Sequence, residues 1–282
     1  MEKICWANTD KLDDAQFVVL GIPDESQSHA LRKGTEAAPF RIREISNERD
    51  SYRRDGKKSL GFPYSNINQR KIFDYGNIDR PQIPNVFKKI SNSKTPISIG
   101  GDHSITTPIV KAISETIGKF SMVYFDAHPD FISSTTNYYG SVFHDILPYI
   151  DSSSSIQIGI RTPEQEELDN LKKHNIKVIT PFDIRKKGLE KISESILNTI
   201  GEKVYVSFDM DCIDPSYAPG VSVPVPLGLN STDAVYLLKK ITQNGIVGMD
   251  IMEVCPSFDV KDRTSHLASR MIAEVIFSAG LK

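Results

Sequence analysis

Cysteine, excess charge and long apolar runs are all scarce in this sequence of 282 residues. Its three cysteines, Cys5, Cys212 and Cys255, are too few and too scattered for a disulfide framework or a paired zinc site, so we expect a reduced, cytoplasmic setting. Lysine and arginine number 34 against 36 aspartates and glutamates, which excludes the basic excess typical of nucleic-acid binders. No uncharged apolar run approaches the roughly 20 residues that span a bilayer, and the first ten residues lack the apolar core of a secretion signal. We therefore expect no nucleic-acid partner and no membrane partner.

Short runs rich in valine, isoleucine, phenylalanine and tyrosine recur along most of the chain, and they alternate with segments of helical length. Such runs are typical of strands buried in a parallel sheet, and the alternation favours an α/β fold with helices on both faces of the sheet. The predicted strands are 17–22, 71–75, 96–100, 120–126, 155–160, 176–180, 203–209 and 245–252.

Several segments between these strands carry helix signals, namely capping residues at their starts and apolar residues at helical spacing. No linker rich in proline, glycine or serine divides the chain, so we expect a single domain over residues 1–282. The charged stretch 46–70 is predicted to be an excursion from the core. The predicted helices are 105–117 with Ser104 as N-cap and Gly118 as its end, 163–173 with Pro163 in its first turn, and 230–243 after Asn230.

Acidic residues and histidines stand where several predicted strands end, and ligands bind beyond the carboxyl ends of parallel strands. One aspartate after a strand is more often a turn former or helix cap than a ligand. Together, however, these residues reach one edge of the sheet, and the alternate spacing of Asp126, His128 and Asp130 can turn three side chains toward one point. Gly100 and Gly101 would let the backbone pass close to a neighbour there. The candidates are His103, Asp126, His128, Asp130, Asp209, Asp211 and Glu253.

Converging carboxylates would repel one another unless cations lay between them. Carboxylates and imidazoles without cysteine suit Mn²⁺, Fe²⁺, Zn²⁺ or Ni²⁺, and the high share of carboxylates favours Mn²⁺. Six candidate ligands, some of them bridging, suggest two metals about 3.5–4 Å apart that hold a hydroxide nucleophile. The pattern therefore predicts a hydrolase. A two-metal phosphoesterase is disfavoured because no basic cluster lies beside the aspartates to receive phosphate.

Four longer motifs resemble the signature segments of the ureohydrolases, the arginase/agmatinase family, and the resemblance extends nearly from end to end. It implies a three-layer α/β/α fold around an eight-stranded parallel sheet, two Mn²⁺ ions per subunit and a homotrimer or homohexamer. It also implies a small cationic guanidino compound as substrate. The four motifs are GGDHS at 100–104, DAHPD at 126–130, SFDMDCIDP at 207–215 and MDIMEV at 249–254.

The resemblance also implies a role for each candidate residue. One metal would be held by His103, Asp126, Asp130 and Asp209, and the other by Asp126, His128, Asp209 and Asp211. A hydroxide bridging the metals would attack the guanidinium carbon, and Asp130 would relay its proton to the leaving amine. Glu253 would pair with the guanidinium N–H groups, a bidentate match of a carboxylate to a planar fork.

The substrate is less closely defined by the motifs. The loop 133–140 does not reproduce the polar loop with which arginases read an amino acid, and Gly140 to Phe143 resembles the agmatinase branch. We therefore expect agmatine, giving putrescine and urea, ahead of guanidinobutyrate, arginine or formiminoglutamate. Tyr139 stands where active relatives place a proton-carrying histidine, and a phenol is a poor proton carrier at neutral pH. His144 is the candidate substitute, and a metal-binding pseudoenzyme is the alternative.

Overall fold

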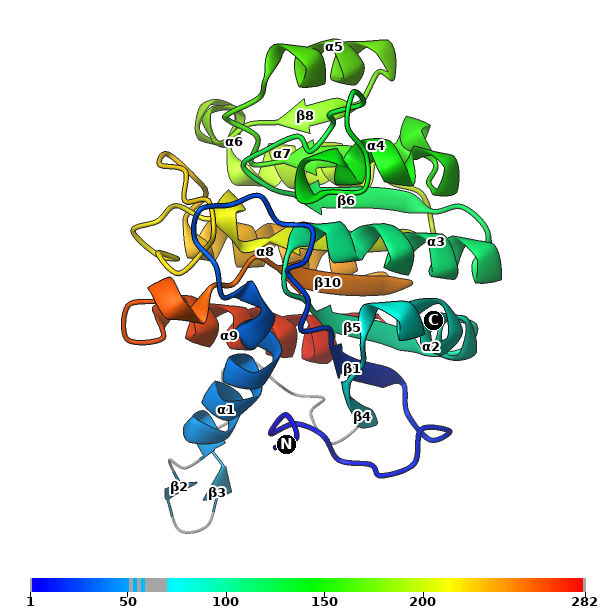
Figure 1. Ribbon diagram of the computed structural model, residues 1–282, viewed down its shortest axis with the longest axis vertical. Coiled ribbons are helices and arrows are strands. Elements are labelled where there is room, and N and C mark those ends of the chain that lie inside the picture. Colours follow the sequence, from blue (N-terminus) through cyan, green and yellow to red (C-terminus); the bar gives the residue numbers. More distant parts are fainter. Residues whose placement is uncertain (1, 51–52, 55–56, 59–69, 281–282) are drawn as a thin grey trace.

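The computed structural model describes residues 2–50, 53–54, 57–58 and 70–280, and its centre is one eight-stranded, fully parallel sheet (Figure 1). All eight predicted strands are present, each within a few residues of its predicted bounds. Across the sheet the strands run in the order β4, β1, β5, β10, β9, β6, β7, β8. Their bounds are β1 Phe17–Gly21, β4 Ile72–Asn77, β5 Thr95–Ile99, β6 Ser121–Phe125, β7 Ile156–Ile158, β8 Lys177–Ile179, β9 Val204–Asp209 and β10 Gly248–Met252.

Helices cover both faces of the sheet and make it the middle of three layers, as the resemblance implied (Figure 1). Side chains alternate along each strand, so Phe17 and Val19 belong to the core on the face covered by α1, α7, α8 and α9, whereas Val18 and Leu20 belong to the core on the opposite face, with α2, α3, α4 and α5. No helix among the described residues is both long and apolar enough to span a bilayer. The helices are α1 Ala38–Asp50, α2 Ile83–Ile90, α3 Thr106–Ile117, α4 Val142–Ile146, α5 Gln165–Lys173, α6 Pro181–Lys187, α7 Leu189–Leu197, α8 Ser231–Thr242 and α9 Arg263–Ser278.

Two predicted helix starts were wrong by one or two residues. Ser104 does not cap α3, because Asp102 caps a 3₁₀ turn at His103–Ile105 by accepting the Ser104 N–H at 2.9 Å, and α3 begins only at Thr106. Pro163 precedes the N-cap residue Glu164 of α5 and so lies outside the first turn. The predicted end at Gly118 is confirmed, as is the start after Asn230, whose side chain accepts the Asp233 N–H at 2.8 Å.

The charged stretch 46–70 is described only in part. Its first residues continue α1 to Asp50, and a short antiparallel ribbon of β2 Arg53–Arg54 and β3 Lys57–Lys58 lies beyond the end of that helix, away from the sheet (Figure 1). Ser46 at its start and Arg70 at its end are buried, so the predicted excursion is wrong at both ends. Residues 51–52, 55–56 and 59–69 of the stretch fall outside the described residues.

The four central strands, β5, β10, β9 and β6, position the candidate site. Their register places Phe125 beside Phe208 and Phe208 beside Ile251. Asp126 and Asp209 therefore leave neighbouring strands at the same height, at the carboxyl edge of the sheet where ligands bind in parallel α/β folds.

Candidate metal centre

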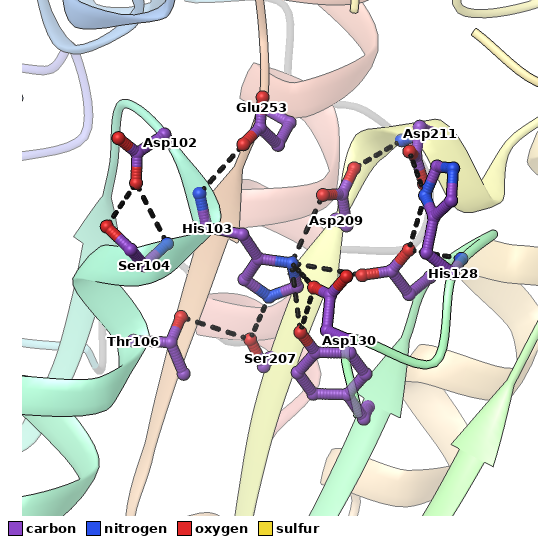
Figure 2. Close-up of polar contacts among 12 residues, drawn as sticks. Asp102, His103, Ser104, Thr106, His128, Asp130, Ser207, Asp209, Asp211 and Glu253 are labelled. Atoms are coloured by element: carbon purple, nitrogen blue, oxygen red, sulfur yellow. Dashed lines mark hydrogen bonds and ion pairs between the residues drawn. The ribbon is translucent and has the colours of Figure 1, made fainter. Parts of the chain in front are cut away.

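A tight turn after β5 brings the first histidine into the site. A Cβ atom on Gly101 would lie 2.0 Å from the Asp24 carbonyl oxygen, and one on Gly100 would lie 1.9 Å from the Met252 sulfur. The predicted close approach of the backbone is therefore confirmed at Gly101, where a side chain would collide with the Asp24 backbone, whereas at Gly100 the Met252 side chain would have to move. The 3₁₀ turn that follows then directs His103 across the ends of the central strands (Figure 2).

The His103 imidazole lies among the carboxylates of the first ligand group. Its Nδ1 atom lies 3.0 Å from Asp126 Oδ2, 3.2 Å from Asp209 Oδ2 and 3.3 Å from Asp130 Oδ2 (Figure 2). On the other side of the ring, Nε2 lies 2.9 Å from Ser207 Oγ, and that hydroxyl donates its hydrogen to Asp250 Oδ1 at 2.7 Å. Ser207 must therefore accept from Nε2–H. Burial lowers the pKa of His103, but Asp126, Asp130 and Asp209 outweigh it and raise that pKa well above its ordinary value. In the neutral ring, the form that binds a cation, the Nδ1 lone pair would face these aspartates.

A second ligand group adjoins the first and shares Asp126 with it. His128 Nδ1 lies 3.3 Å from Asp126 Oδ1 and 3.0 Å from Asp211 Oδ2. Backbone N–H groups fix the carboxylates, since Asp211 Oδ1 accepts from Ala127 at 3.0 Å and Asp209 Oδ1 accepts from Asp211 at 2.7 Å. Of the predicted ligands, the described chain thus gathers His103, Asp126 and Asp130 into one group and Asp126, His128 and Asp211 into the other, with Asp209 beside the first.

The electrostatics of this cluster favour cations. Burial, with Asp130 and Asp211 close by, raises the pKa of Asp126 to about 7, and burial with Asp211 and Asp126 raises the pKa of Asp209 well above its ordinary value. Burial lowers the pKa of His128, but the facing Asp211 and Asp126 outweigh it and raise that pKa to about 12. The protein therefore holds aspartates close together against their mutual repulsion.

The residues fit a pair of divalent cations. Asp126 Oδ2 is buried and accepts no hydrogen bond, although His103 Nδ1 is only 3.0 Å away. Lone pairs of one nitrogen and three carboxylate oxygens consequently face one point, and a hard or borderline cation is the partner that this donor set prefers. The buried Cys212 directly follows Asp211 in the chain, but neither ligand group includes a thiol.

A cavity of about 370 Å³ opens above the ligands. Its floor holds the aspartates and Glu253, and its walls bring together Ile132, Tyr138 and Tyr139 from one loop and Glu164 and Glu167 from the start of α5. Among the described residues that line it there is no lysine and no arginine. The cavity is therefore lined by acidic side chains on its floor and by acidic and aromatic side chains on its walls.

Glu253 and Asp130 both occupy the left-handed region of backbone conformation, with φ of 63° and 47°. Glu253 Oε1 accepts the His103 N–H at 2.8 Å, and Oε2 accepts from the Ser222 hydroxyl. Burial raises the pKa of Glu253 to about 8. A cationic group beside Glu253 would favour its ionised form again.

Tyr139 and its candidate substitute as proton carrier, His144, occupy different places. Tyr139 lines the cavity and is half-buried, and burial together with Glu253 and Asp130 raises the pKa of its phenol. His144 lies on α4, where its Nδ1 is 3.4 Å from Asp145 Oδ1, and it is not among the described residues that line the cavity.

Several residues of the site were not predicted as such. Glu164 and Glu167 stand at the start of a predicted helix, where acidic residues ordinarily match the helix dipole, and nothing local marks Ser222, which reaches Glu253 across 31 positions. Tyr124 had no signal because a tyrosine inside an apolar strand is typical of a core residue.

The fold and the site define a class: three-layer α/β proteins with a carboxylate-rich centre for two divalent cations at the carboxyl edge of the sheet. Within that class the chain belongs to the Arginase family, whose profile matches residues 15–278.

Relatives of known name are similar over most of the chain. An agmatinase of Cronobacter sakazakii is 32% identical over 286 residues, covering 95% of this chain and 89% of the relative. An agmatinase of Neisseria meningitidis is 37% identical over 199 residues, covering 69% of this chain but only 63% of the relative's length. The crystal structure of the agmatine ureohydrolase of Thermoplasma volcanium superposes with a TM-score of 0.84 at 30% identity, covering 99% of this chain and 94% of that one.

Proposed function

We propose that this protein is a hydrolase that cleaves the guanidino group of agmatine, with water, to putrescine and urea, and that its two cations are Mn²⁺. The observation that carries the proposal is the acidic cavity above the ligand groups, which has no lysine or arginine among its described lining residues. Such a cavity suits a substrate that is cationic at both ends. The agmatinases named above support the same substrate.

The far end of the cavity argues for agmatine over its rivals. Arginine, guanidinobutyrate and formiminoglutamate each carry a carboxylate, whereas agmatine ends in an ammonium group. Both oxygens of the buried Glu167 accept backbone N–H groups, from Phe131 at 3.1 Å and from Glu164 at 2.8 Å, so this acid is fixed in place. Burial raises the pKa of Glu167 to about 7, and a bound ammonium group would favour its ionised form. In that form Glu167, together with the exposed Glu164, attracts an ammonium group and repels a carboxylate.

The cations and two side chains would each have a separate role in the reaction. The two cations, when bound, would lower the pKa of a water molecule and so supply a nucleophile at neutral pH. The Glu253 carboxylate would pair with the guanidinium N–H groups and hold the carbon over the aspartates. Asp130 would take the proton that the water loses on an oxygen of its carboxylate and pass it to the departing amine.

The test is hydrolysis by purified protein loaded with Mn²⁺. We expect urea release from agmatine with a kcat/KM at least tenfold above those for arginine and guanidinobutyrate, with formiminoglutamate cleavage followed by release of glutamate. No turnover of any of the four compounds would overturn the proposed activity. Faster turnover of a substrate that carries a carboxylate would overturn the choice of agmatine.

A pseudoenzyme that binds metal and a guanidino ligand is the second candidate, because Tyr139 is the residue at the cavity wall where the family's histidine would lie. The raised pKa of this phenol leaves it protonated at neutral pH and unable to accept a proton. Rapid urea release by the unmodified protein would exclude this candidate.

A further inference from the structure

Tyr124 lies inside the centre, although it belongs to the middle of strand β6. It is fully buried, and it precedes the shared ligand Asp126 by two positions, so both side chains point to the same face of the strand. Its hydroxyl donates to Asp130 Oδ2 at 2.6 Å, and its oxygen lies 3.1 Å from His103 Nδ1.

The ring of Tyr124 adds a second contact with the same ligand group. It stacks on the His103 imidazole with ring centres 4.7 Å apart and an angle of 4° between the planes. Phe143 closes its other side edge-on at 5.4 Å. The two ring contacts hold the phenol in place, and the phenol in turn restrains both His103 and Asp130.

Asp130 needs such a restraint. Its backbone is in the left-handed region at φ 47°, which is strained for a residue with a side chain, and its carbonyl oxygen is tied to the Phe143 N–H at 2.9 Å. The backbone is therefore held from one side, and the hydrogen bond from Tyr124 fixes the carboxylate from the other.

These contacts are asymmetric. Tyr124 contacts the members of the first ligand group, His103 and Asp130, and the described residues show no hydrogen bond from it to His128 or Asp211 of the second group.

We propose that Tyr124 is a positioning residue for one of the two cations: its hydroxyl and ring hold Asp130 and His103 in place for the first metal and leave the second metal unaffected. This inference rests on the metal centre of the proposed function but not on the choice of substrate. Groups that orient metal ligands typically contribute 10- to 100-fold to metal affinity.

The experiment is a Mn²⁺ titration of the metal-stripped protein, with unbound Mn²⁺ measured by electron paramagnetic resonance. Wild type should show two binding steps. In Tyr124→Phe, which keeps the ring and loses only the hydroxyl, we expect one step to weaken 10- to 100-fold and the other to stay unchanged. His128→Asn, which removes a ligand of the second group, should leave the step that is sensitive to Tyr124→Phe.

A matched control and a rescue make the result specific. Tyr236 on α8 also donates its hydroxyl to a carboxylate, that of Glu190, and neither residue belongs to a ligand group. Tyr236→Phe should leave both steps unchanged. Excess Mn²⁺ is the rescue: Tyr124→Phe keeps every metal ligand, so at saturating Mn²⁺ it should again bind two ions per chain.

Three results would overturn the inference: two unchanged steps in Tyr124→Phe, equal weakening of both steps, or fewer than two ions bound by Tyr124→Phe at saturating Mn²⁺. Hydrolysis of agmatine is measured in a separate assay, so that the two proposals can fail independently. A protein that hydrolyses agmatine but shows no selective loss refutes only the role of Tyr124, whereas selective loss without agmatine turnover refutes only the proposed substrate.

Discussion

Glu253 shows how single residues are held in costly conformations at this centre. Left-handed backbone at a residue with a side chain costs on the order of 1–3 kcal/mol, and Glu253 adopts it at φ 63°. The conformation is stabilised because its N–H donates to the Gly101 carbonyl at 2.9 Å while its side chain accepts from His103. The loops after β5 and β10 therefore fix each other, and the strained residue points its carboxylate into the cavity.

The first prediction concerns that carboxylate. Glu253→Gln should lower kcat/KM for agmatine about 100-fold, because a hydrogen bond to a charged group contributes about 1.5–3 kcal/mol and each 1.4 kcal/mol is a factor of ten. Steady-state kinetics at full Mn²⁺ loading measure the effect. Glu115→Gln, which alters an exposed glutamate that pairs with Lys88 at 2.7 Å, is the control and should change nothing. Equal activity of the two variants would refute the role of Glu253.

The second prediction concerns proton transfer at the cavity wall. Tyr139→His places an imidazole where the phenol has a raised pKa, so kcat for urea release should rise about tenfold or more while KM stays within a few-fold. Tyr138→His, at the neighbouring position of the same wall, is the control and should not raise kcat. A fall in kcat for Tyr139→His would mean that the tyrosine itself contributes to turnover.

At the scale of elements, the strands could be predicted from the sequence because buried parallel strands are continuous apolar runs that end at polar residues. The grouping of the candidate ligands could be predicted for the same reason, since Asp126 directly follows such a run and Asp209 ends one. Tyr124 and Glu167 could not be predicted, because their roles depend on partners that only the folded chain brings near, Asp130 in one case and the cavity in the other. The cap at Asp102 was missed because a 3₁₀ turn precedes α3.

The third prediction tests how α1 is attached to the edge strand β4. Arg43 is fully buried and donates to both oxygens of Asp74 at 2.9 Å, with further bonds to Asn77 and to backbone carbonyls. Arg43→Met should lower the free energy of unfolding by about 3–5 kcal/mol, because it leaves Asp74 buried without its counter-charge. Urea denaturation measures the change.

Arg41→Met is the matched control on the same helix. Its guanidinium pairs with Asp262 and Glu44 but is partly exposed, so we expect a loss of about 0–1 kcal/mol. Similar losses in the two variants would show that burial of the Arg43 pair is not what matters.

At the scale of the whole molecule, pH should act on stability through the acidic centre. Asp126 and Glu253 have raised pKa values of about 7 and 8, so their protonated forms stabilise the metal-free fold at low pH. That stability is lost as pH rises from their unfolded values, near 4, through 7 and 8. With chelator present, the urea midpoint should therefore fall between pH 5 and pH 8.

Excess Mn²⁺ should flatten or reverse this slope, because metal binding favours the ionised carboxylates and releases protons. The paired measurement with and without Mn²⁺ is its own control. A midpoint that falls equally with pH in both conditions would show that the carboxylates are not the metal ligands.

The fifth prediction concerns assembly. We expect a homotrimer or homohexamer, and the exposed Phe182 and Leu227, which line one surface hollow beside α6, are apolar side chains that a subunit contact would cover. Light scattering coupled to gel filtration should give the mass of three or six chains for wild type and a smaller species for Phe182→Asp. Leu31→Asp, at an exposed leucine on another loop, should keep the wild-type mass. A monomeric wild type would refute the expectation.

The spread of the ligands along the chain has a consequence for biosynthesis. His103 follows β5, the third strand of the main sheet in chain order. Its backbone N–H donates to the carboxylate of Glu253, which lies 150 residues later in the chain. A nascent chain on the ribosome therefore presents scattered acids and histidines, and both cation sites exist only once the strands synthesised early and late have paired across the middle of the sheet. If the proposed centre binds Mn²⁺, tight retention of the ions would be a readout of completed folding, and a chain that stalls or is cut before β9 should hold neither ion firmly.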